Sequence, residues 1–112
     1  MRADDAVRIR HMIDAAESAL DFTRGRTRID LDKDTMLQFA LVRAVEVVGE
    51  AASKISAEGR AELPQVRWAA IMVMRNRLAH AYFEIDMDIL WITLQQALPA
   101  LLAQLKSKQL LE

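Results

Sequence analysis

The sequence lacks cysteine and has only three glycines and two prolines among its 112 residues. Without cysteine it has neither a disulfide framework nor a thiolate nucleophile. The few glycines and prolines leave few places where regular structure must break, and no low-complexity tract or flexible linker is present. These features predict one ordered domain that spans residues 1–112.

The sequence also lacks a strong excess of charge and a long apolar run. Its formal net charge is −1, whereas proteins that bind nucleic acid over a broad surface are strongly basic. Any contact with nucleic acid must therefore be local. The longest apolar stretch, residues 68–74, is far shorter than the roughly 20 residues that span a bilayer. Charged residues from Arg2 onward interrupt the start, so we predict no signal peptide and expect a cytoplasmic protein.

The signatures of several enzyme classes are missing as well. The chain contains no H-E-x-x-H, Walker loop, G-x-G-x-x-G or G-x-S-x-G sequence, which zinc hydrolysis, nucleotide hydrolysis, dinucleotide binding and serine-esterase chemistry respectively require. His11 and Asp14 are close enough on one helix to touch, but two ligands without a cysteine or a second histidine make a poor metal site. We therefore predict no metal and no cofactor.

Helical periodicity dominates what is present. Apolar residues recur at spacings of three and four in four segments. The predicted helices cover residues 5–24, residues from 30–34 to about 55, a stretch that starts at 64, and a stretch that starts at 86 or 88. Asp4 or Asp5 is the expected cap of the first helix, and Pro64 suits the first turn of the third.

The connections predict how these helices are arranged. They are short, which favours antiparallel neighbours, and residues 57–63 have room for an extra short helix. Pro99 is expected to kink or split the last helix. Nothing alternates with a period of two for long enough to predict a strand. The sequence therefore predicts an all-α fold, an antiparallel up-down four-helix bundle.

Residues 75–82 carry the most reactive side chains of the chain. An apolar run ends in an arginine, an asparagine, a histidine and a tyrosine within eight residues. A guanidinium is a fixed cation whose donors match a phosphate, and an imidazole has the side-chain pKa closest to neutral pH. Together they suggest phosphodiester cleavage.

Helix geometry constrains how these groups meet. Asn76 and His80 lie about 40° apart around a helix, so Asn76 is predicted to orient His80. Arg75 and His80 lie about 140° apart and cannot reach one small group from a straight helix. Either the helix ends or bends near His80, or a second element completes the site.

The spacing of Arg75, His80 and Tyr82 resembles the R-x4-H-x-Y signature of the HepT branch of the HEPN superfamily. The similarity covers essentially the whole chain: residues 43–52 look like the second helix of that family, and residues 63–68 look like its entry into the motif helix. Two positions depart from the family pattern. Val73 stands where a small residue is common, and Ala81 stands where glycine is common; both bear on local geometry, because neither removes a reactive group.

The resemblance implies a HEPN-like bundle and the toxin half of a toxin–antitoxin pair of type II or VII. It implies a metal-independent ribonuclease in which the RNA 2′-hydroxyl attacks, His80 moves the proton and Arg75 stabilises charge on the phosphoryl oxygens. Such a reaction needs both a base and an acid, whereas the motif holds one histidine. A two-fold homodimer, as in that family, would bring two copies of His80 and Arg75 into one cleft.

The resemblance also implies partners. Tyr82 is expected to receive AMP from a partner nucleotidyltransferase antitoxin, which would silence the enzyme. RNA contacts are predicted for Arg77, next to the motif, and for three arginines between the first two helices, Arg24, Arg26 and Arg28; the alternative for these side chains is a solvated run of charge. An alternative function is a non-catalytic helical adaptor for a nucleotidyltransferase, and a third is a purely structural bundle.

Overall fold

The computed structural model describes the backbone of residues 1–80 and 86–111, and their side chains except those of residues 79, 80 and 109–111. All regular structure in this part of the chain is helical, which confirms the predicted all-α class. The elements are α1 (Ala3–Thr23), α2 (Arg28–Lys33), α3 (Thr35–Ser53), α4 (Ala57–Ala61), α5 (Trp68–His80), α6 (Met87–Ile92), the π-helix η1 (Thr93–Ala97) and α7 (Leu98–Leu111).

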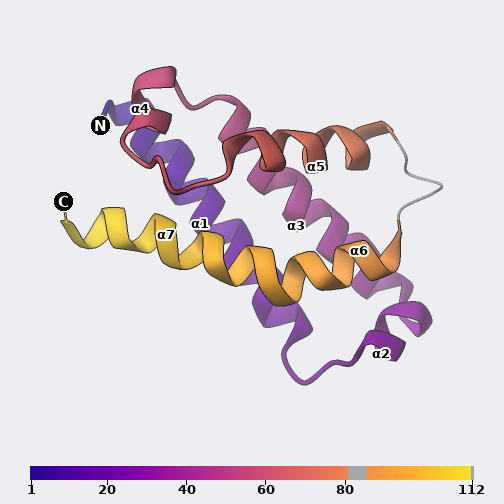
Figure 1. Ribbon diagram of the computed structural model, residues 1–112. Helices are drawn as coiled ribbons and strands as arrows, with labels where there is room; N and C mark the ends of the chain where they lie inside the picture. The colour runs from indigo at the N-terminus through magenta and orange to yellow at the C-terminus, as the bar shows by residue number, and fades with distance from the viewer. Residues whose placement is uncertain (81–85, 112) are drawn as a thin grey trace.

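The helix α3 lies at the centre of the fold. It packs against α1 on one side and α5 on the other, and α7 packs against α1. Neighbouring helices run in opposite directions, and both chain termini lie at the same end of the molecule (Figure 1). The predicted up-down bundle is therefore confirmed, with α6, η1 and α7 together forming its fourth member. None of the described helices combines the length and the apolar character needed to cross a membrane.

Two of the predicted helix starts are wrong. Arg2, not Asp4 or Asp5, precedes the first turn of α1, and it makes no side-chain capping hydrogen bond. The third long helix begins at Trp68 rather than at Pro64. Residues 63–66 instead form hydrogen-bonded turns that bury two apolar side chains, Leu63 and Val66.

The segment predicted as one helix from 30–34 onward is divided in two. The capping box of Thr27 and Asp30 starts α2. Asp34 then caps α3 by accepting a hydrogen bond from the backbone N–H of Leu37 (3.0 Å). Several aspartates in a row supply several start signals, and the chain uses more than one of them.

The last helix begins and divides as predicted. The carboxylate of Asp86 accepts hydrogen bonds from the backbone N–H groups of Asp88 and Ile89, which starts α6. Pro99 lacks an N–H and cannot continue the α-helical hydrogen-bonding pattern. The preceding turn is a π-helix, with the N–H of Leu98 bonded to the carbonyl of Thr93.

Asp5 connects α1 to the approach of the motif helix. Its carboxylate is buried and accepts hydrogen bonds from the hydroxyl and the backbone N–H of Ser56. These bonds hold the pKa of Asp5 below its ordinary value. Ser56 in turn caps α4, the predicted short helix, by accepting from the N–H of Gly59 (3.1 Å). The entry to α5 is therefore fixed to the start of the chain.

Candidate active site

Arg75 lies where α5 crosses α3, directly over Gly49. A Cβ placed on Gly49 would come within 2.5 Å of Arg75 Cβ and 2.8 Å of its Cγ. The missing side chain of glycine thus lets the two helices approach and seats the stem of Arg75 on α3. Gly49 was not among the residues predicted to matter from the sequence. The feature that could have indicated it is an isolated glycine inside a helical pattern, which often has a packing reason.

The guanidinium of Arg75 has one neighbour in hydrogen-bond contact within the described residues. Its Nη1 donates to Oδ1 of Asn76 at 3.4 Å. Asn76 is exposed, and Arg75 is partly so. The predicted orientation of His80 by Asn76 stays a prediction, and the amide oxygen of Asn76 is already used by Arg75.

His80 is the last residue of α5. Its side chain and the whole of Tyr82 lie outside the described residues, so their roles also stay predictions. Since α5 is a continuous α-helix from Trp68 to His80, no break separates Arg75 from His80. A straight helix keeps them about 140° apart, which favours completion of the site by a second element.

The acidic side chains on α3 beside Gly49 are neutralised locally. Arg43 pairs with Glu50 at 3.3 Å and with Glu46 at 4.0 Å, so the two carboxylates share one cation. Arg75 forms no ion pair with a described carboxylate. Its guanidinium is therefore available to bind a phosphate group.

Two of the arginines predicted to bind RNA are paired with aspartates. Arg24 lies 2.6 Å from Asp21, and Arg26 lies 3.3 Å from Asp34. The Arg24–Asp21 pair is largely exposed and the Arg26–Asp34 pair is partly exposed, and ion pairs in contact with solvent are weak and readily exchanged. An RNA phosphate could therefore displace the carboxylates, and RNA binding by these residues stays a prediction.

Arg28 is held more firmly than Arg24 or Arg26. It pairs with Asp32 at 2.7 Å and with Asp88 at 2.8 Å. The hydrogen bonds that Arg28 donates to these carboxylates, that to Asp32 foremost, raise the pKa of the guanidinium further above its ordinary value. The pair with Asp88 joins α2 to α6, the helix that follows the motif. Arg77, by contrast, is exposed, and its guanidinium forms no hydrogen bond or ion pair with the described residues.

Exposed apolar side chains lie on α5, which carries the motif, and on α3, which packs against it. Met36 is 83% exposed and Phe39 72% exposed on α3, and Val73 is 54% exposed on α5. Met36 and Phe39 are three residues apart in the first turns of α3, so they lie on one side of that helix. Large exposed apolar side chains that lie together often mark a protein–protein interface.

Comparison with known proteins gives a consistent result. The family model described as HepT-like, "Ribonuclease HepT-like", matches residues 12–107. A protein of Thermococcus cleftensis described as "Probable ribonuclease HepT" is 36% identical over 88 residues, which cover 79% of this chain and 80% of that protein. A protein of Caldanaerobacter subterraneus subsp. tengcongensis described as a "Putative RNase" is 33% identical over 98 residues, 88% of each chain. No solved structure matches this chain.

Proposed function

Since this chain belongs to the HepT-like ribonuclease family, we propose that it is a toxin that cleaves RNA without a metal, using the 2′-hydroxyl of the substrate as the nucleophile. The observation that carries this proposal is the seating of Arg75. Its stem is anchored on Gly49, and its guanidinium bonds only to Asn76 among the described residues. A positioned cation without a carboxylate partner suits a phosphoryl group.

Arg75 and His80 have different roles in this reaction. The 2′-hydroxyl attacks the adjacent phosphorus, and the bond to the 5′-oxygen of the next nucleotide breaks. His80 moves the proton, and Arg75 stabilises the negative charge that develops on the phosphoryl oxygens. The products are a 2′,3′-cyclic phosphate and a 5′-hydroxyl. DNA resists cleavage because it lacks the attacking hydroxyl.

A homodimer supplies the second acid–base group. The reaction needs a base for the attacking hydroxyl and an acid for the leaving oxygen, and the motif contains one histidine. A two-fold axis near the end of α5 would bring two His80 and two Arg75 residues together. The exposed apolar side chains of Met36 and Phe39 on α3 and of Val73 on α5 support an interface that includes these two helices.

Control is proposed to act through Tyr82. A partner nucleotidyltransferase, the antitoxin of the pair, would transfer AMP to its phenol. Tyr82 is the only tyrosine in the chain and stands two residues after His80. The added phosphate would be negatively charged, so it would occupy Arg75 and repel RNA.

The test is cleavage of a labelled RNA by the purified chain and by single variants. We expect His80→Ala and Arg75→Ala to lower the rate by about a hundredfold or more. His11→Ala is the matched control, because His11 lies on α1, is exposed, and is the other histidine of the chain. It should cleave RNA as the unmodified chain does.

Two results would contradict the ribonuclease proposal. One is undiminished RNA cleavage by His80→Ala; the other is DNA cleavage that depends on His80. If the unmodified chain does not cleave RNA but binds a nucleotidyltransferase whether or not Arg75 and His80 are replaced, the adaptor function is the better description.

A further inference from the structure

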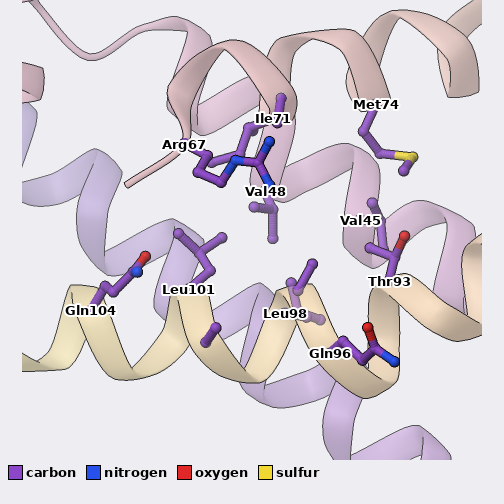
Figure 2. Close-up of a pocket in the computed structure, with 13 residues that line it drawn as sticks. Val45, Val48, Arg67, Ile71, Met74, Thr93, Gln96, Leu98, Leu101 and Gln104 are labelled. Carbon is purple, nitrogen blue, oxygen red and sulfur yellow. The ribbon is translucent and has the colours of Figure 1, made fainter. Parts of the chain in front are cut away.

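A groove with a volume of about 430 Å³ separates α5 from the helical unit of η1 and α7. Its floor comes from α3, which contributes Val45 and Val48, and Figure 2 shows side chains of α5 and α7 facing each other across it. The other lining residues are Arg67, which directly precedes α5, Ala70, Ile71 and Met74 from α5, and Thr93, Gln96, Ala97, Leu98, Ala100, Leu101 and Gln104 from the opposite wall.

The groove has the dimensions of a docked helix. One wall extends from Arg67, directly before α5, to Met74 on α5, about 10 Å at the helical rise, and the opposite wall extends from Thr93 to Gln104, about 16 Å. The alanines along its rims, Ala70, Ala97 and Ala100, are exposed. Small side chains there would let the backbone of a third helix come close while its own side chains enter between the walls.

The interior of the groove is aliphatic. Besides the two valines of the floor, it is lined by Ile71, Met74, Leu98 and Leu101. No aromatic ring occurs among the lining residues that the structure describes, so the groove offers no surface on which a nucleobase would stack. The lining therefore suits aliphatic side chains of a protein better than it suits RNA.

The charges of the residues around the groove indicate which kind of partner it would bind. Arg67 is exposed, and its guanidinium reaches over the groove toward Val48 (Figure 2). This guanidinium forms no hydrogen bond or ion pair with any described residue. The guanidinium of Arg77, also exposed and unpaired within the described chain, lies ten residues further along the sequence, on α5. The opposite rim carries the neutral Gln96 and Gln104, and no described lining residue is acidic.

We propose that this groove binds an acidic amphipathic helix of a second protein. The helix would place aliphatic side chains, three and four residues apart, against the floor formed by α3, and a carboxylate on its flank would pair with Arg67. The widened turn of η1 shapes one wall of this site. Arg75 is not among the residues that line the groove, so the inference stands apart from the proposed role of that residue in RNA cleavage.

The test uses two synthetic, fluorescently labelled helical peptides of about 18 residues, long enough to form helix in isolation. Both carry leucines on one face; one has glutamates and the other has lysines on the flanks. Fluorescence anisotropy should show that the chain binds the glutamate peptide about tenfold or more tightly than the lysine peptide. Arg67→Glu should reverse this preference. Ala100→Trp should abolish binding of both peptides, with circular dichroism confirming that the variant is folded.

Arg10→Glu is the matched control, because it makes the same charge change on α1, away from the groove. It should leave the preference for the glutamate peptide unchanged. The proposal is overturned if the glutamate peptide does not bind, or if Arg10→Glu reverses the preference as Arg67→Glu does. It is also overturned if an RNA oligonucleotide displaces the bound peptide, or if Ala100→Trp dissociates a dimer of this chain. Cleavage of RNA by Arg67→Glu and Ala100→Trp should persist, which separates this inference from the ribonuclease proposal.

Discussion

The Cβ and Cγ atoms of Arg75 occupy the space that a side chain on Gly49 would need. The two residues belong to different helices, and a methyl group on Gly49 would come within 2.5 Å of Arg75 Cβ. The distance between α3 and α5 and the position of the candidate catalytic cation are therefore set by the same contact. A change on α3 should act on the chemistry of α5 without touching the motif.

Replacing Gly49 by Ala should disturb both stability and activity. The added methyl group must push α5 away, which costs about 1–3 kcal/mol in the free energy of unfolding. The displaced Arg75 should lower the rate of RNA cleavage by about a hundredfold, because catalysis is sensitive to shifts of about an ångström. Urea unfolding and a single-turnover cleavage assay measure the two effects.

Ala44→Gly is the control for Gly49→Ala. It weakens the same helix by about 1 kcal/mol through loss of helix propensity, but it adds no atom near Arg75. At a temperature where both variants are folded, only Gly49→Ala should lose activity. Equal losses in the two variants would show that general destabilisation, not the position of Arg75, is responsible.

Mixing subunits should reveal whether the site is shared. If one cleft needs two copies of His80, a dimer with one His80→Ala subunit is inactive. Random exchange between equal amounts of unmodified and His80→Ala subunits leaves about one quarter of the dimers fully unmodified. The cleavage rate per dimer should then fall to about one quarter. A fall to only one half would indicate that each subunit works alone.

Tyr82→Phe should separate RNA cleavage from its control. The variant keeps Arg75 and His80, so it should cleave RNA at a rate close to that of the unmodified chain. It lacks the phenol that would accept AMP, so incubation with the partner nucleotidyltransferase and ATP should leave its mass unchanged. If mass spectrometry finds AMP on Tyr82→Phe, the acceptor has been assigned wrongly.

Acid should weaken the fold through Asp5. Hydrogen bonds from Ser56 lower the pKa of Asp5 in the folded chain, and the backbone N–H of Thr27 does the same for Asp30. A lowered native pKa adds stability that is complete above the ordinary value of about 3.9 and is lost as the pH falls through the native pKa.

Asp5→Asn should therefore be less stable than the unmodified chain at neutral pH, and the difference should shrink as the pH falls below about 4. Urea midpoints at a series of pH values measure this. Ser56→Ala removes the hydroxyl that donates to Asp5, so the stability of this variant should also depend less on pH than that of the unmodified chain. The assigned role of Asp5 would be contradicted if the difference in urea midpoint between Asp5→Asn and the unmodified chain stayed constant down to the lowest pH at which both are folded.

The sequence by itself determined the features that depend on neighbours along the chain. Apolar spacing predicted the all-α class and four long helical segments, Asp86 or Asp88 was predicted to start the last of them, and Pro99 was predicted to kink or split it. The spacing of Arg75, His80 and Tyr82 pointed to the family. These signals are legible because capping, proline geometry and helical periodicity act over only a few residues.

Only the tertiary structure decided what joins distant parts of the chain. It placed Arg75 on Gly49, paired Arg28 with Asp88, and left a groove beside Arg67. Arg28 and Asp88 are 60 residues apart, and the distance between α5 and α7 depends on how each packs against other helices. No local pattern encodes such relations, because they arise from the packing of whole helices, in which one absent side chain sets how closely two of them approach.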